Sequence, residues 1–258
     1  MNIDSLLITI LTTIAPVAIM GYYIYKKDYL KPEPLRALLL TAFFGFIGGF
    51  LTTLLVWNLG LPNIYAIQES EVTVSALLHV MEAIALGYLV MMVILALLII
   101  FNRHFDEQMD GIVYASFIAL GFILCQNAGY LLFHGDLIVD TDAMRALFLV
   151  PIYFFCAIFS GYFVSRLYYR KPRWTWKLAY DLCCFIVIPF ACHTVLTAIL
   201  LASEIRLSAW LGALFCLGLI YVCFLTMNVA IQFIESHLAR DVRDSMKLPA
   251  EPEQQEAL

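Results

Sequence analysis

Residues 72–101 read VTVSALLHVMEAIALGYLVMMVILALLIIF, a continuous apolar run in which Glu82 is the only formally charged side chain. A transmembrane α-helix needs about 20 consecutive apolar residues, so this run is long enough to cross a bilayer. The whole chain has the same character, because 63% of its 258 residues are hydrophobic and 14% are charged. Soluble domains carry about 25% charged residues. The composition therefore excludes a soluble enzyme, a nucleic-acid-binding protein and a disordered scaffold.

Other apolar runs of similar length flank this one along the chain. The predicted spans are Leu6–Tyr25, Leu35–Trp57, Val72–Phe101, Gly111–Phe133, Met144–Tyr169, Leu178–Ala202 and Ala209–Ile234. The segments that connect them are short and polar, so none can hold a soluble domain. We therefore predict an all-α, polytopic membrane bundle of about seven helices within residues 1–237. A polar cytoplasmic tail, predicted to be disordered, follows in residues 238–258.

The basic residues predict the orientation of the bundle. With alternating loops, every lysine and arginine except Arg145 and Arg206 falls on the side that carries the C-terminus. The positive-inside rule then places the C-terminus in the cytoplasm and the N-terminus outside. No basic segment precedes the first run, so we expect a retained span and not a signal peptide. All cysteines lie within predicted spans, where they are typical of packing residues.

Polar side chains within the predicted spans are candidates for function, because such groups are costly in a membrane. His79 and Glu82 lie three residues apart on one helix face, Gln126 and Asn127 are adjacent in the fourth span, and His193 lies in the sixth. The positions of four of these residues along their spans predict a common depth, at about 1.5 Å per residue. Roughly 10–15 Å below the outer surface lie His79, Glu82, Gln126 and His193. Such a layer is either a functional site or an interhelical hydrogen-bond cluster that only holds the bundle together.

Several stretches resemble the PrsW-type intramembrane peptidases. They are YKKDYLKPEPLRALL at 25–39, FDEQMDGIVYASFIALGFILCQNAGYLL at 105–132 and FACHTVLT at 190–197. The second resembles the most recognisable stretch of that family, an Asp-Gly pair that leads into a helix ending in GF-x3-EN-x2-Y. Glu82 and Gly87 align with the EE-x2-K helix of the family. The resemblance runs in order through about residues 20–200.

The resemblance implies a glutamate-dependent intramembrane endopeptidase that cleaves membrane proteins at or within the membrane, and the depth of the polar layer predicts cleavage near the outer leaflet. The chemistry needs a carboxylate that deprotonates a water molecule, and Glu82 is the implied base. Of the family's acidic and histidine residues, Glu82 and His193 are at their expected places. His79 is additional to the family pattern and lies one turn before Glu82, where it could replace a missing partner, so the predicted catalytic set is Glu82, His193 and His79. The residues implied to orient the substrate are Gln126, Asn127 and Tyr130.

The chain also departs from the family pattern at four positions. Ala83 stands where the second glutamate of EE-x2-K belongs, and Leu86 stands where the lysine belongs. The glutamate of GF-x3-EN is Gln126, which cannot act as a base at any pH. The family's fifth-span histidine falls within PIYFF at 151–155, where Tyr153 is the only polar residue.

Two functions remain open after these departures. The first is an endopeptidase with a reduced site, and the second is an inactive pseudoprotease that acts as a scaffold or binding module for other membrane helices. A proton-carrying transporter is a weaker third hypothesis. In any of these cases, Gly45, Gly48 and Gly49 of the second span allow another helix to approach closely.

The expected partners are the lipid bilayer and membrane-protein substrates or partner helices, with no nucleic acid. No cofactor is expected, and a zinc cluster of His79, Glu82 and His193 is the alternative, since two histidines and a carboxylate leave an open position on zinc. We expect a multi-pass protein of the bacterial inner, or cytoplasmic, membrane.

Overall fold

The computed structural model describes residues 3–28, 32–60, 74–101, 105, 107–133 and 139–169, and some isolated positions between 180 and 236. The described helices are α1 (Ile3–Lys27), α2 (Leu35–Asn58), α3 (Val74–Phe101), α4 (Gln108–Phe133) and α5 (Val139–Tyr169). Within these ranges the chain contains no strand. The isolated positions, among them 180, 187, 221 and 228, are also helical. The predicted all-α class is therefore confirmed for the described chain.

Four described segments are long and apolar enough to cross a membrane: Leu35–Asn58, Met81–Phe101, Met109–Gly129 and Leu149–Tyr169. They confirm the second to fifth predicted spans. Helix α1 covers the first predicted run without being one of these segments. The sixth and seventh runs, apart from isolated positions, and the tail 238–258 lie outside the described residues. The side of the membrane on which each terminus lies stays a prediction.

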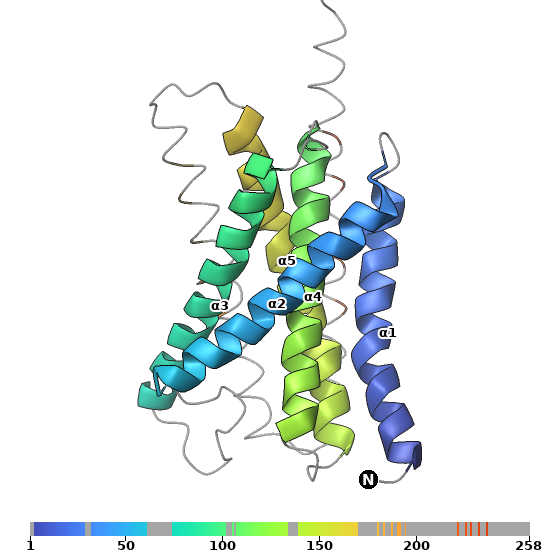
Figure 1. Ribbon diagram of the computed structural model, residues 1–258, viewed down its shortest axis with the longest axis vertical. Helices are drawn as coiled ribbons and strands as arrows, with labels where there is room; N and C mark the ends of the chain where they lie inside the picture. Colours follow the sequence, from blue (N-terminus) through green and yellow to red (C-terminus); the bar gives the residue numbers. More distant parts are fainter. Residues whose placement is uncertain are drawn as a thin grey trace, which may run out of the picture.

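Helix α4 lies at the centre of the described bundle. It packs against α1, α2, α3 and α5, and every residue from Met109 to Ile123 is buried. Figure 1 shows α2 crossing α4 obliquely, while α1 and α5 run along the length of α4. A helix that is apolar all round its surface is expected in such a central position.

Glycines bring the backbones of α2 and α4 into direct contact. A Cβ atom on Gly45 would collide with the carbonyl oxygen of Ile118, and one on Gly49 would lie 2.8 Å from both Cys125 Cβ and Phe122 O. From the other side, a Cβ on Gly121 would collide with the carbonyl oxygen of Ala42. The predicted close approach is thus confirmed at Gly45 and Gly49, where the partner is α4, whereas Gly48 faces Ile94 and Val90 of α3.

The threonine hydroxyl groups of α2 donate hydrogen bonds within the helix. Thr52 Oγ1 donates to Gly48 O at 2.9 Å, and Thr53 Oγ1 donates to Gly49 O at 3.0 Å. Such bonds to the preceding turn satisfy a hydroxyl where water is absent. On the opposite side of the bundle, Tyr23 Oη of α1 donates to Oδ1 of Asn228 at 2.6 Å, which links α1 to the seventh predicted run.

Candidate functional site

Gln126 faces α2 and is partly buried between the two helices. Its Nε2 atom donates to the carbonyl oxygen of Gly49 at 2.9 Å and to Oγ1 of Thr53 at 3.2 Å. The residue therefore serves an interhelical contact, as the structural interpretation of the polar layer predicted. These two bonds occupy its amide nitrogen, so a role in orienting substrate would fall to the amide oxygen.

Asn127, one residue further along α4, has a different environment. Its side chain is 4% exposed, and within the described structure neither Nδ2 nor Oδ1 has a hydrogen-bond partner. Leaving a buried donor and acceptor unpaired costs about 1–3 kcal/mol for each group. A group that carries one donor face and one acceptor face matches the N–H and C=O of an extended peptide.

Glu82 lies on the exposed face of α3. Its neighbours Ala83 and Ile84 are buried, with exposed fractions of 5% and 1%, whereas Glu82, like Leu89 and Val93, is exposed. Glu82 and Gln126 lie 19 and 18 residues from the ends of their helices at Phe101 and Gln108, about 28 Å along at 1.5 Å per residue. The two residues thus lie at similar distances along their helices but on different faces, and their common depth in the membrane stays a prediction.

The other predicted site residues cannot be placed in the same way. The side chains of His79 and Tyr130 and the whole of His193 lie outside the described residues. The proposed convergence of His79, Glu82 and His193 therefore stays a prediction.

The interior between α3, α4 and α5 is filled by aromatic rings. Tyr88 of α3 and Tyr153 of α5 are stacked with a centroid separation of 6.1 Å and an interplanar angle of 8°, and Phe122 of α4 lies 5.5 Å from Tyr153. All three side chains are at least 95% buried. We call Tyr88, Phe122 and Tyr153 the aromatic middle. Tyr153 is the polar residue of the stretch 151–155 in which the resemblance places the family's fifth-span histidine, whereas nothing in the sequence singled out Tyr88.

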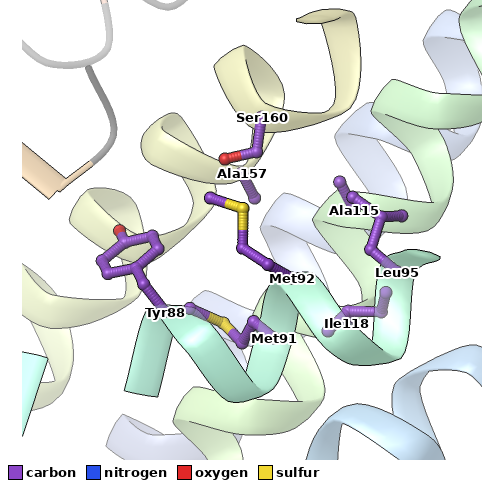
Figure 2. A pocket seen from close by; sticks show the side chains of 8 residues that line it. All are labelled: Tyr88, Met91, Met92, Leu95, Ala115, Ile118, Ala157 and Ser160. Carbon is purple, nitrogen blue, oxygen red and sulfur yellow. The ribbon is translucent and has the colours of Figure 1, made fainter. Parts of the chain in front are cut away.

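A cavity of about 20 Å³ adjoins the aromatic middle. Figure 2 shows its lining, in which Met92 extends from α3 toward Ala157 and Ser160 of α5. The Ser160 hydroxyl donates to Cys156 O at 3.1 Å. A cavity of this size holds at most about one water molecule. It is too small for a segment of a peptide substrate.

A second polar cluster lies where α1 ends and where α2 and α4 begin. The main-chain N–H of Glu33 donates to Asp28 Oδ2 at 2.9 Å, and Tyr114 Oη donates to Glu33 Oε2 at 2.6 Å. Asp28 and Glu33 are 2% and 5% exposed, and Asp110 of α4 is fully buried. We call Asp28, Glu33, Asp110 and Tyr114 the acidic end. Both segments that form the acidic end resemble stretches of the family, but no feature of the sequence predicted that they are in contact.

Burial raises the pKa of the Asp28 carboxyl group above its ordinary value, and the hydrogen bond from the Glu33 N–H opposes this in part. Asp110 caps its own helix, because its Oδ2 accepts from the N–H of Glu107 at 2.8 Å. A side chain in the first turn that bonds back to the cap residue is one half of a capping box. The acidic end therefore anchors the α1–α2 connection to α4.

The described residues do not fit a metal site. No three histidine, cysteine, aspartate or glutamate residues among them gather as metal ligands do. Gln126 directs its amide nitrogen, which is a donor and not a ligand atom, at α2. The zinc cluster of the sequence analysis requires His79 and His193 and stays a prediction.

Comparison with known proteins identifies the relatives of this chain. The family model described as "PrsW family intramembrane metalloprotease" matches residues 33–231. The chain is 30% identical over 192 residues to "Protease PrsW" of Geobacillus kaustophilus, covering 74% of this chain and 79% of the relative. It is also 30% identical over 205 residues to "Protease PrsW" of Clostridioides difficile, covering 78% and 81%.

A further relative is "Protease PrsW" of Bacillus subtilis, 28% identical over 201 residues, with 77% of this chain and 83% of the relative covered. No solved structure matches the chain. The apolar helices, the family match and the extent of these alignments agree with one another. This integral membrane protein belongs to the PrsW family of intramembrane proteases.

Proposed function

We propose that this chain is a PrsW-family protein that binds transmembrane segments of other proteins without hydrolysing them. We place it in the bacterial cytoplasmic membrane, with its N-terminus outside. The observation that carries the proposal is the stack of Tyr88 and Tyr153 in the bundle interior. One of the two stacked rings, that of Tyr153, lies in the stretch where the resemblance implies a histidine. A phenol, with an ordinary pKa near 10, stays protonated at neutral pH and is a poor proton acceptor.

The contacts of Gln126 support the same proposal. Its amide stands where the family has a glutamate, and it donates two hydrogen bonds to α2. An amide has no proton equilibrium in water near neutral pH, so it stabilises the helix pair at every pH and cannot activate water. The two substitutions turn family positions that could transfer protons into positions that hold helices together.

Asn127 supports the binding half of the proposal. Because both polar atoms of its buried amide lack partners in the described structure, a peptide backbone that reaches them would gain two hydrogen bonds. A scaffold or chaperone for membrane helices needs such contacts but needs no nucleophile. The partners proposed are therefore membrane-protein segments with locally unwound, accessible backbone.

One observation favours an active endopeptidase as the second candidate. Glu82 is exposed on α3, so its carboxylate is not sealed within the packed interior of the bundle. In this candidate Glu82 deprotonates the water, and His79 and His193 assist. All the relatives named above are called proteases, which agrees with it.

The test compares membrane-protein fragments and abundances in cells that carry wild type, a deletion, Glu82→Gln or Leu89→Gln. Leu89→Gln is the matched control, because it puts the same amide on the same exposed face of α3 without removing an acid. We expect identical fragments in all four strains, with a set of membrane proteins reduced in abundance only in the deletion. A fragment that is lost both in the deletion and in Glu82→Gln, but kept in the control, would establish the peptidase. Unchanged abundances in the deletion would contradict the binding function.

A further inference from the structure

An open, apolar groove of about 600 Å³ lies between α1 and α2 and is floored by α4. Its lining includes Gly21 of α1, Leu39 and Phe43 of α2, and Phe117 and Leu120 of α4. The groove does not share a residue with the aromatic middle or with the acidic end, so neither site described above accounts for it.

The groove exists because α2 leaves α1 while it stays in contact with α4. Glycines hold α2 against α4, and Figure 1 shows that α2 then runs obliquely away from α1. Gly21 adds no side chain to the groove on the α1 side, where a Cβ atom would lie 3.5 Å from Leu120 Cδ1. In a protein that spans a membrane, an open apolar groove of this kind faces the hydrocarbon of the bilayer.

Basic residues lie at one end of the groove. Lys26 follows the lining residue Tyr25, and its Nζ is 5.6 Å from the ring centroid of Tyr22, which also lines the groove. Arg36 follows the lining residue Leu35, and both cations are exposed. The nearby acids Asp28 and Glu33 are buried and do not reach the surface to neutralise them.

This arrangement complements one class of molecule. We propose that the groove binds an acyl chain of an anionic phospholipid, whose phosphate contacts Lys26 and Arg36. Basic pockets between transmembrane helices on the cytoplasmic side attract anionic head groups, and the predicted orientation puts these two residues on that side. A transmembrane helix, about 10 Å across and about 30 Å long, needs several times the volume of this groove.

The test uses purified protein, stripped of lipid in detergent and titrated with dioleoyl phosphatidylglycerol or dioleoyl phosphatidylcholine, with bound lipid counted by native mass spectrometry. Wild type should bind the anionic lipid more tightly. Ala18→Phe fills the groove from an exposed lining position and should abolish binding of both lipids. Its control is Ala96→Phe, which adds the same ring at an exposed position of α3 outside the groove.

The second part of the test removes both cations at the end of the groove, in a double variant that carries Lys26→Gln and Arg36→Gln. This double variant should lose about tenfold or more in affinity for phosphatidylglycerol, following the attraction of each basic residue for an anionic surface, and should keep its affinity for phosphatidylcholine. Arg166→Gln, which removes a cation at the end of α5, should change neither. Equal binding of the two lipids by wild type, or unchanged binding in Ala18→Phe, would overturn the proposal, as would a protein segment found bound in place of lipid.

Discussion

The acidic end and the aromatic middle belong to the same bundle and share α4, yet they are built from opposite kinds of residue. At the acidic end, carboxyl groups are retained in buried positions and are bonded to a phenol and to main-chain N–H groups. In the aromatic middle, Tyr153 lies within the stretch 151–155 where the resemblance implies a histidine, and its ring packs against Tyr88 and Phe122. Gln126, beyond the middle, holds α2.

This difference separates what the fold requires from what hydrolysis requires. The acidic end anchors the α1–α2 connection to the start of α4, and the bundle needs that anchor whether or not the protein cleaves anything. A catalytic residue need not stabilise the fold, so a packing residue can replace it while the fold is kept. The chain has buried acids at the acidic end and an amide at Gln126, while Glu82 is retained on the exposed face of α3.

The largest expected effect comes from removing the centre of the aromatic middle. Tyr153→Ala deletes a buried ring that contacts both Tyr88 and Phe122, and truncating a buried aromatic side chain costs about 3–5 kcal/mol. Equilibrium unfolding in mixed micelles measures the loss. The control Leu89→Ala, at a 60% exposed position of α3, should change stability little. A comparable loss in both variants would show that the aromatic middle is not a packed core.

The next effect is at the acidic end. Tyr114→Phe removes the hydroxyl that donates to Glu33 Oε2, and the loss of a partner for a buried polar group costs about 1–3 kcal/mol. We expect a loss of stability in that range by the same unfolding measurement. Tyr22→Phe, at a residue that is 64% exposed, serves as the control and should leave stability unchanged. An unchanged Tyr114→Phe would mean that the phenol does not anchor the connection.

A smaller effect is expected between α2 and α4. Gln126→Leu removes the donor to Gly49 O and Thr53 Oγ1, and interhelical hydrogen bonds in membranes average about 0.6 kcal/mol each. We expect a loss of about 1 kcal/mol. Thr53→Val removes only one of the two acceptors and should cost less. If Gln126→Leu left stability unchanged while altering membrane-protein abundance in cells, Gln126 would belong to the binding site and not to the helix contact.

The smallest effect depends on pH. Because burial raises the pKa of Asp28 above its ordinary value of 3.8, the folded state favours the neutral carboxyl group. The Asp28 contribution to stability is therefore fully present below that ordinary value and is lost as pH rises through the raised pKa. Asp28→Asn keeps an acceptor for the Glu33 N–H and cannot ionise. Thermal unfolding between pH 4 and pH 7 should show a smaller decline with rising pH in the variant, and equal slopes would contradict the pKa shift.

Sequence could predict the helices but not which side of a helix faces the interior. The apolar runs predicted the helices of α2 to α5. Helix α3 is apolar on every side, so its composition carries no signal that distinguishes a buried face from an exposed one. Glu82 lies six residues from Tyr88, about 120° around the helix, and only packing decides which of the two faces the interior.

The acidic end was equally hard to predict, for a different reason. Glu33 and Tyr114 are separated by 81 residues, and the carboxylates lie in segments that sequence alone describes as connectors. A connector carboxylate is normally solvated, so nothing in the composition indicated burial. Both segments resemble stretches of the family, but the resemblance does not predict that they are in contact.

The glycines of α2 have a consequence for assembly. Gly45 and Gly49 form a G-x-x-x-G pattern, which often marks the face through which membrane helices dimerise. Here that face is already occupied by the backbone of α4 within one molecule. Two copies of this protein therefore cannot associate through this face of α2. Enlarging either glycine would disturb the packing of α2 on α4 within the single subunit.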